Sequence, residues 1–205
     1  MVFCLLFRKM LLFLDTETTG LAPGNICQLS YVMQSDSGVI AKNMFFEVDH
    51  VPKEAVAIHG FSAEKLKVLS NGLTFKDRIE EIEKDFSQAN VIVAHNFSFD
   101  YSFLREEFLR QNKVFTYSKS YCSMKSTVPV CKLKRPNSAG FKYPKLSELC
   151  EFLGIKDKQI LKTAVNLFGS KCGYHDARFD TTAVYLAVNK LIEKNIDNSL
   201  KEYLG

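Results

Sequence analysis

Four carboxylates and one histidine are the residues of this sequence best suited to chemistry. Asp15 and Glu17 lie in the run LFLDTETTGL, Asp100 ends the run VIVAHNFSFD, and His175 and Asp180 lie in YHDARFDTTA. Carboxylate oxygens are the ligands that Mg²⁺ and Mn²⁺ prefer, and such ions serve in the hydrolysis of phosphodiester bonds. The three segments together therefore predict a divalent-metal site for phosphodiester chemistry.

The pair Asp15 and Glu17 follows directly on a short apolar run. Residues two apart on a strand point to the same face. Both side chains are therefore expected in one cleft just past the carboxyl end of the strand, where open α/β sheets place their ligands. Two carboxylates so close repel each other unless a cation lies between them. In the alternative interpretation, Asp15 is a turn or helix cap and Glu17 is a surface charge.

Asp100 is expected in the first turn of a helix that follows a buried strand, where it can face the same sheet end as Asp15. Its neighbours His95, Asn96 and Ser98 can hydrogen-bond backbone or substrate. A lone acidic residue at this place more often offsets the helix dipole and has no further role.

His175 and Asp180 stand at the start of the last long helix. Asp180 can join the metal ligands, and His175, one step before the helix, can lie over them. Histidine is the side chain best suited to take a proton from water near neutral pH. A single histidine before a helix is otherwise more often structural.

The elements that must position these residues follow from apolar periodicity and from caps and turns. Strands are expected at residues 10–14, 26–34, 39–48, 91–94 and 114–116, with a hairpin turn at 35–38. Helices are expected at residues 52–59, 63–69, 75–88, 99–111, 122–131, 146–153, 159–168 and 176–193, and a loop at 132–144. Within 122–131, Pro129 favours an early end of the helix. This order predicts an α/β fold, with a mixed sheet and helices packed on its faces.

The 205 residues fit one domain, 1–205, better than two. Residues 1–9 are expected to be an apolar lead-in to the first strand, in which residues 2–7 can extend a sheet edge. Arg8 and Lys9 interrupt this run, which argues against a signal peptide, and Met10 is a possible internal start. No run reaches the roughly 18 apolar residues that a membrane span needs, so we expect no membrane contact.

Six cysteines show no CxxC pair and no common zinc spacing. Reduced thiols are expected, in a cytoplasmic protein, with Cys27 and Cys150 in the core. The net charge of +4 is unevenly distributed, because residues 113–171 carry 12 Lys and Arg against 3 Asp and Glu. A basic segment beside an acidic site suits a nucleic-acid enzyme, although a solvated basic face without a partner is an equally good interpretation of charge alone.

The segments DTETTGL, AHNFSFD and HDARFD resemble the three motifs of the DEDDh, or DnaQ-like, 3′–5′ exonucleases, with Asp15, Glu17, Asp100, Asp180 and His175 at the five site positions. The segments IHG and KYPKLSELCEFLGI resemble elements of the DNA polymerase III epsilon-type proofreading members. The residue four before the last Asp is Asp176 and not tyrosine, which excludes the tyrosine branch of the family. The stretch 156–174 departs from a compact member and is expected to be an inserted helix and loop.

The resemblance implies a ribonuclease H-like mixed sheet of about five strands and two divalent cations, Mg²⁺ or Mn²⁺, on the order of 4 Å apart. It implies metal binding by Asp15, Glu17, Asp100 and Asp180, with His175 as the general base. The product would be a nucleoside 5′-monophosphate released from a 3′ end. The residues expected to bind substrate are Thr16, Thr18, Gly20, Leu21, His59, Phe61, Asn96, Phe97 and Phe99.

The preferred substrate is single-stranded DNA with a free 3′ end, and a polymerase is a possible partner. An exoribonuclease that trims RNA 3′ ends or short oligoribonucleotides remains an alternative, because its site would be the same. A nucleic-acid-binding module without catalysis is a third interpretation, and the intact set of five site residues argues against it. In a fourth, the acidic residues are only caps and surface charges.

Overall fold

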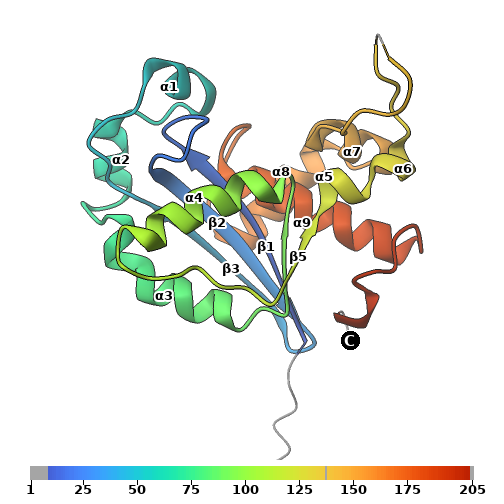
Figure 1. Cartoon of the computed structure of the whole chain (residues 1–205), viewed down its shortest axis with the longest axis horizontal. Coiled ribbons are helices and arrows are strands. Elements are labelled where there is room, and N and C mark those ends of the chain that lie inside the picture. The colour runs from blue at the N-terminus through green and yellow to red at the C-terminus, as the bar shows by residue number, and fades with distance from the viewer. Residues whose placement is uncertain (1–8, 137, 204–205) are drawn as a thin grey trace, which may run out of the picture.

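The computed structural model describes residues 9–136 and 138–203, and a five-stranded sheet runs through its centre (Figure 1). The strands are β1 (Met10–Thr18), β2 (Ile26–Ser35), β3 (Gly38–Phe45), β4 (Val91–Ala94) and β5 (Lys119–Cys122). Their order across the sheet is β3-β2-β1-β4-β5. Because β1 pairs antiparallel with β2 and parallel with β4, the sheet is mixed, as expected.

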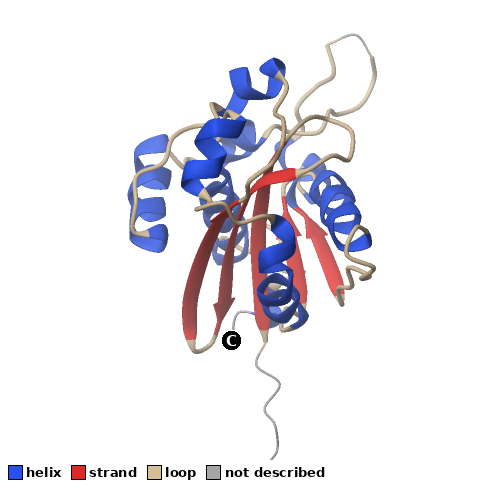
Figure 2. Ribbon diagram, turned by 90° about the vertical axis from the view of Figure 1, so that its left-hand side faces the viewer, coloured by secondary structure: helices blue, strands red, loops and turns tan. Residues whose placement is uncertain are grey.

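Helices cover both faces of this sheet (Figure 2). The longer ones are α3 (Phe75–Ser87), α4 (Phe97–Leu109), α8 (Asp157–Phe168) and α9 (Ala177–Glu193). The shorter ones are α1 (Lys53–His59), α2 (Ala63–Leu69), α5 (Ser123–Ser126), α6 (Val128–Cys131) and α7 (Leu146–Leu153), and a 3-10 turn, η1 (Lys201–Tyr203), follows α9. Within the ranges 9–136 and 138–203, no helix has both the length and the apolar character needed to cross a membrane.

Alternation along β1 decides which helices its side chains meet. Leu11 and Phe13 pack with Val184 of α9, whereas Leu12 and Leu14 pack in the core formed with α3 and α4. All four β1 side chains are fully buried, and each contributes roughly 1.5–3 kcal/mol to folding through burial of apolar surface. Successive residues of a strand face opposite sides, so the next odd-numbered residues face α9 and the next even-numbered residues face α4.

β1 is longer than expected. It continues to Thr18, so Asp15 and Glu17 lie inside the strand, whereas the prediction placed them just past its end. The reason is β2, which pairs with β1 along its whole length. The register shifts between Glu17, opposite Gln28, and Thr18, opposite Ile26. Such a bulge bends a strand and changes the direction of its side chains.

The last strand was predicted at the wrong place, 114–116. Phe115 is buried among aromatic rings, with its ring centroid 5.6 Å from Phe86 and 5.1 Å from Phe108, while Val114 is 70% exposed. The segment is therefore held by one side chain and not by strand pairing. The fifth strand is β5, which pairs in parallel with β4.

The segment 122–131 was predicted to be helical with an early stop at Pro129, and it forms two short helices, α5 and α6. Pro129 stands at the start of α6, and because it has no amide hydrogen it cannot continue the hydrogen bonding of α5. α4 and α8 each begin two residues earlier than expected, and the other elements agree to within three residues. The predicted edge extension at residues 2–7 lies outside the described residues.

Candidate active site

Three carboxylates converge on the α9 side of the sheet. Asp15 and Glu17 continue the odd-numbered side of β1, and Asp180 lies in the first turn of α9. One oxygen from each of the three carboxylates lies within 4.8 Å of the others. The two-residue spacing on β1 therefore brings Asp15 and Glu17 together as the sequence predicted, and α9 supplies the third acid.

Asp100 approaches from the other side of the sheet. It lies in the first turn of α4, is 2% exposed, and accepts a 2.8 Å hydrogen bond at Oδ1 from the Thr16 hydroxyl. It is not part of the close group of three carboxylates, but its charge raises the pKa of both Asp15 and Glu17. The four acids thus act electrostatically on one another, with Thr16 holding Asp100 in place.

Burial raises the pKa of all four carboxyl groups, and in each case the charge of a neighbouring acid raises it further. Burial is the largest cause in each case, and the charge of Asp180 is the next for Asp15 and Glu17. The pKa of Asp15 lies well above its ordinary value, and the pKa is raised to about 8 for Glu17, about 7 for Asp100 and about 6 for Asp180. A bound divalent cation would stabilise their ionised forms. The oxygen-only donor set fits a hard cation such as Mg²⁺ or Mn²⁺.

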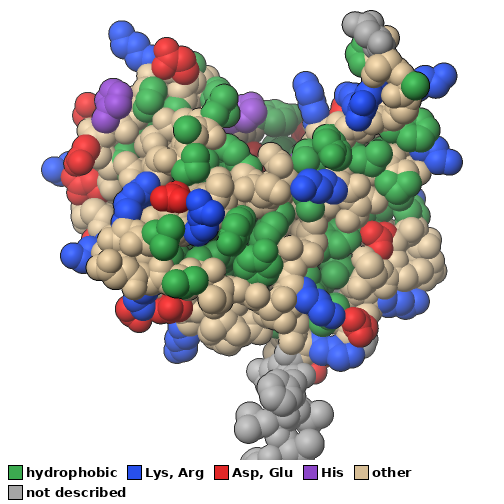
Figure 3. Space-filling model, in the orientation of Figure 1, with side chains coloured by type: hydrophobic (Ala, Val, Ile, Leu, Met, Phe, Trp, Pro, Cys, Tyr) green, Lys and Arg blue, Asp and Glu red, His purple; other side chains and the backbone are tan. Residues whose placement is uncertain are grey.

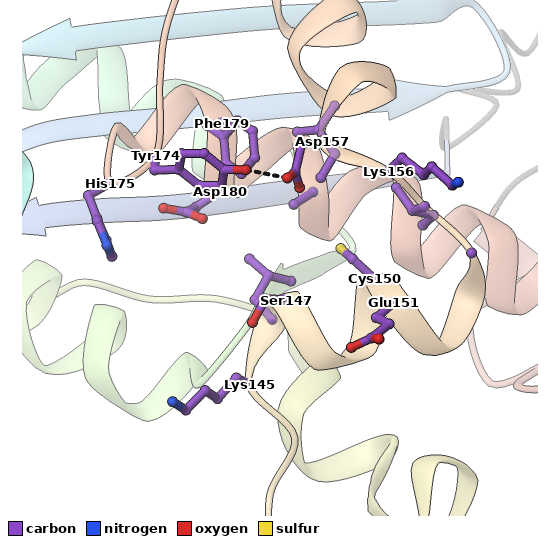
Figure 4. A pocket seen from close by; sticks show the side chains of 15 residues that line it. Lys145, Ser147, Cys150, Glu151, Lys156, Asp157, Tyr174, His175, Phe179 and Asp180 are labelled. Carbon is purple, nitrogen blue, oxygen red and sulfur yellow. Dashed lines mark hydrogen bonds between the residues drawn. The ribbon is translucent and has the colours of Figure 1, made fainter.

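His175 lies at the edge of this group. It is exposed, it has a left-handed backbone conformation with φ of 54°, and it directly precedes Asp176, the cap of α9. Its charge lowers the pKa of Asp180, so the two side chains interact. Both residues line one cavity of about 650 Å³ between α7, α8 and α9 (Figure 4). The structure therefore places the predicted histidine beside the predicted metal ligands.

A buried polar network that the sequence did not reveal fixes the start of α9. Arg178 donates to both carboxylate oxygens of Asp176, over 2.9 Å from Nε and 2.6 Å from Nη2. Gln28 of β2 donates from Nε2 to Asp176 over 2.9 Å and accepts from the Ala177 amide over 3.0 Å. Burial raises the pKa of Asp176, but the hydrogen bonds from Arg178 and Gln28 outweigh burial and hold it below its ordinary value. Gln28 therefore anchors the turn that carries His175.

Nothing in the local sequence marks Gln28, because its partners lie far along the chain. Its strand also contains Ser30, Gln34 and Ser35, so a polar residue is no signal there, and only the fold shows that Gln28 is fully buried. Asp176, by contrast, carried a signal, because Asp is a favoured helix cap, and its side chain accepts from the Arg178 amide as a cap does.

A second cavity, of about 500 Å³, lies between the end of β1, α1 and α4. Leu21 and Ile58 at its rim are 89% and 58% exposed. His59 lies at its base, where the Phe61 amide donates to Nδ1 over 3.1 Å, and Nε2 lies 3.3 Å from the Thr18 carbonyl oxygen. Burial is the main reason that the pKa of His59 is lowered, so its Nε2 donates to Thr18 as a neutral imidazole does.

Six of the nine residues expected to bind substrate line this second cavity: Thr16, Thr18, Gly20, Leu21, His59 and Phe99. The other three do not line it. Phe61 is buried beneath α1 with its ring stacked on His59, and Phe97 is buried and stacks on Tyr101. Asn96 precedes α4 in a left-handed conformation with φ of 73°, which asparagine adopts more readily than most other residues.

Comparison with known proteins adds three findings. The RNase_T family model, described as "Exonuclease", matches residues 12–188. DNA polymerase III PolC-type from Mycoplasmopsis pulmonis (strain UAB CTIP) is 31% identical over 109 residues, which cover 49% of this chain and 7% of that protein. E. coli Exonuclease I in complex with a dT13 oligonucleotide has a TM-score of 0.70 at 19% identity, over 95% of this chain and 43% of that one.

Exonuclease I from Methylocaldum szegediense gives a TM-score of 0.68 at 16% identity, over 92% of this chain and 41% of that one. At these identities the structures show a common fold, the ribonuclease H-like exonuclease fold, and this chain spans less than half of their length. The family match, by contrast, extends over most of this chain and includes all three acidic segments. The chain therefore belongs to the DEDDh, DnaQ-like family of exonucleases.

Proposed function

We propose that this protein is a metal-dependent 3′–5′ exonuclease that removes nucleoside 5′-monophosphates from the 3′ end of DNA. The observation that carries the proposal is the group of three carboxylates within 4.8 Å, with His175 on one side and an apolar cavity on the other. Exonuclease I, which shares the fold, is described in complexes with dT13 and dA16 oligonucleotides. This supports single-stranded DNA as the substrate class.

In the proposed mechanism, Asp15, Glu17 and Asp180 would hold divalent cations, and Asp100 would complete the site. Bound cations of this kind stabilise negative charge on the phosphate and on the leaving oxygen and make a water molecule more acidic. The exposed imidazole of His175 takes the proton of the attacking water. Leu21 and Phe99 orient the terminal nucleoside, because apolar surfaces accept any base.

The PolC-type relative suggests a polymerase as a partner, since its name is that of a polymerase. In this proposal the chain would supply the exonuclease activity to a replication complex. Co-purification with a polymerase, and its loss after charge reversal of surface residues, would test that association separately from catalysis.

The decisive experiment incubates the protein with 5′-labelled single-stranded DNA, duplex DNA and RNA, with Mg²⁺ and with chelator. We expect a ladder that shortens from the 3′ end, that disappears with chelator, and that forms fastest on single-stranded DNA. Faster shortening of RNA would change the substrate class and leave the chemistry intact. Shortening that persists in chelator would contradict the metal-dependent mechanism.

A further inference from the structure

Two exposed lysines lie close to the candidate active site on its α5–α7 side. Lys145 lines the same cavity as His175 and Asp180 (Figure 4). The Nζ of Lys125 lies 3.4 Å from the Ser98 hydroxyl, in the first turn of the helix that carries Asp100. One lysine is thus adjacent to the α9 side of the acidic group and the other to its α4 side.

His95 connects the segments that carry these lysines to the end of β4. Its Nε2 lies 3.0 Å from the Pro144 carbonyl oxygen, and its Nδ1 lies 3.0 Å from the Ser123 hydroxyl. Burial lowers the pKa of His95 to about 4, so the neutral ring donates to Pro144 and accepts from Ser123. Pro144 directly precedes one lysine and Ser123 stands two residues before the other, so a single side chain fixes both segments.

Charge on this side of the molecule is unbalanced. Residues 113–147 contain eight Lys and Arg and no Asp or Glu. Two of the eight form ion pairs, Lys113 with Glu80 and Glu83 and Lys142 with Glu148, and Lys119 donates to the Tyr203 hydroxyl. Among the described residues, Lys125 and Lys145 take part in no ion pair. The two lysines are therefore available to an anionic ligand.

The positions of the two cavities indicate that this anion is the phosphate backbone of the substrate strand. Helices α1 and α7 stand on opposite sides of the end of β1 (Figure 1). Residues of α1 line the apolar cavity, whereas Lys145 directly precedes α7 and Lys125 belongs to α5. Figure 3 shows the surface hollowed between these sides, with Lys and Arg side chains gathered beside the hollow. A strand whose terminal nucleoside fills the apolar cavity can continue through this hollow, past the acids and toward the lysines.

We propose that Lys125 and Lys145 form a phosphate-binding pair that holds the backbone of the substrate strand on the 5′ side of the bond to be cut. This inference rests on the proposed exonuclease function. It predicts that the pair affects long substrates only, because a single nucleotide has no phosphate on that side. Contacts to phosphate are independent of sequence and depend on salt.

The test compares Lys125→Ala/Lys145→Ala with Lys84→Ala/Lys194→Ala. The control lysines are also exposed, but one lies in the last turn of α3 and the other at the end of α9. Binding of fluorescein-labelled oligothymidylate is measured by anisotropy in an Asp15→Asn background, so that it does not depend on cleavage. Hydrolysis of thymidine 5′-monophosphate p-nitrophenyl ester is measured without that background, because the ester carries only the scissile phosphate.

We expect the Kd for the oligonucleotide to rise about tenfold in the double variant. Its log–log dependence on salt should become shallower by about 1.4, at roughly 0.7 for each phosphate contact on a single strand. Hydrolysis of the ester should not change, and Lys125→Arg/Lys145→Arg should restore most of the binding. A Kd and salt dependence equal to those of the control would overturn the inference, as would an equal loss of ester hydrolysis. Failure of the wild-type protein to hydrolyse the ester contradicts the proposed function and not the binding result.

Discussion

The two sides of the acidic group present different chemistry to a substrate. On the α1 side, Leu21, Ile58 and Phe99 surround a cavity that is mainly apolar. On the α7 side, Lys145 borders a cavity that His175 also lines, and Lys125 lies beside Ser98 of α4. A nucleotide has an aromatic base and an anionic backbone, so an apolar side and a basic side would divide its recognition between them. The acids between the two sides would then be left for the chemistry alone.

The largest effect should follow from a change in the acids themselves. We expect Asp15→Asn to reduce hydrolysis of both the ester and an oligonucleotide by roughly 10³-fold or more, as loss of a central catalytic group does. Oligonucleotide binding should persist, because both sides of the site remain. Initial rates in Mg²⁺ and anisotropy measure the two effects separately. Asp36→Asn, in the exposed hairpin turn, is the control, and near-normal turnover by Asp15→Asn would remove Asp15 from the metal site.

Replacing His175 tests whether the side of the site that carries Lys125 and Lys145 contributes to catalysis as well as to substrate binding. We expect His175→Ala to lower kcat by about 10²- to 10⁴-fold, the usual contribution of general acid–base catalysis, with little change in KM. His50→Ala is a matched control, since His50 is also exposed. Full kinetics on the ester distinguish the outcomes. A rise in KM equal to the fall in kcat would assign His175 to substrate binding.

The sequence was sufficient to identify the acids of the site, but it was not sufficient to predict the contacts that hold them in place. The spacing of Asp15 and Glu17 fixes a common face on any strand, so their convergence was predictable even though the end of β1 was placed too early. The side on which Asp100 and Thr16 meet depends on which helices cover each face, and this is a tertiary property. Local periodicity contains no such information.

Long-range partners explain the other differences. Phe115 reads as part of a strand, but its ring packs among Phe86 and Phe108, and the chain pairs with β4 only further on. Gln28 lies 148 residues from its partner Asp176. Apolar patterns thus identify the elements, whereas buried polar contacts between distant segments become visible only in the folded chain.

Protonation of His95 at low pH should destabilise the segments that carry Lys125 and Lys145, because its neutral ring connects them. Its folded pKa of about 4 lies below the unfolded value of about 6.5, so its contribution to stability is fully present above about pH 6.5. That contribution is lost as the pH falls through about 4, and it amounts to about 3 kcal/mol. We expect the wild-type free energy of unfolding to fall by about that much more than that of His95→Gln over this range. Urea unfolding at several pH values measures it, with His50→Gln as control, and parallel curves for wild type and His95→Gln would contradict the assignment.

The smallest effect should come from the apolar side. Leu21 is 89% exposed, so Leu21→Ala should leave the core unchanged and remove only the proposed contact with the terminal nucleoside. Fully burying a leucine side chain is worth about 1.5–3 kcal/mol, and a nucleoside in the cavity would cover Leu21 at the rim only in part, so we expect KM to rise roughly tenfold or less. The rise should be the same for the ester and for an oligonucleotide, and the salt dependence should stay unchanged because no charge is removed. Val68→Ala, on α2 and also exposed, is the control. An effect confined to oligonucleotides would place Leu21 on the 5′ side of the bond and would remove the difference between the two sides.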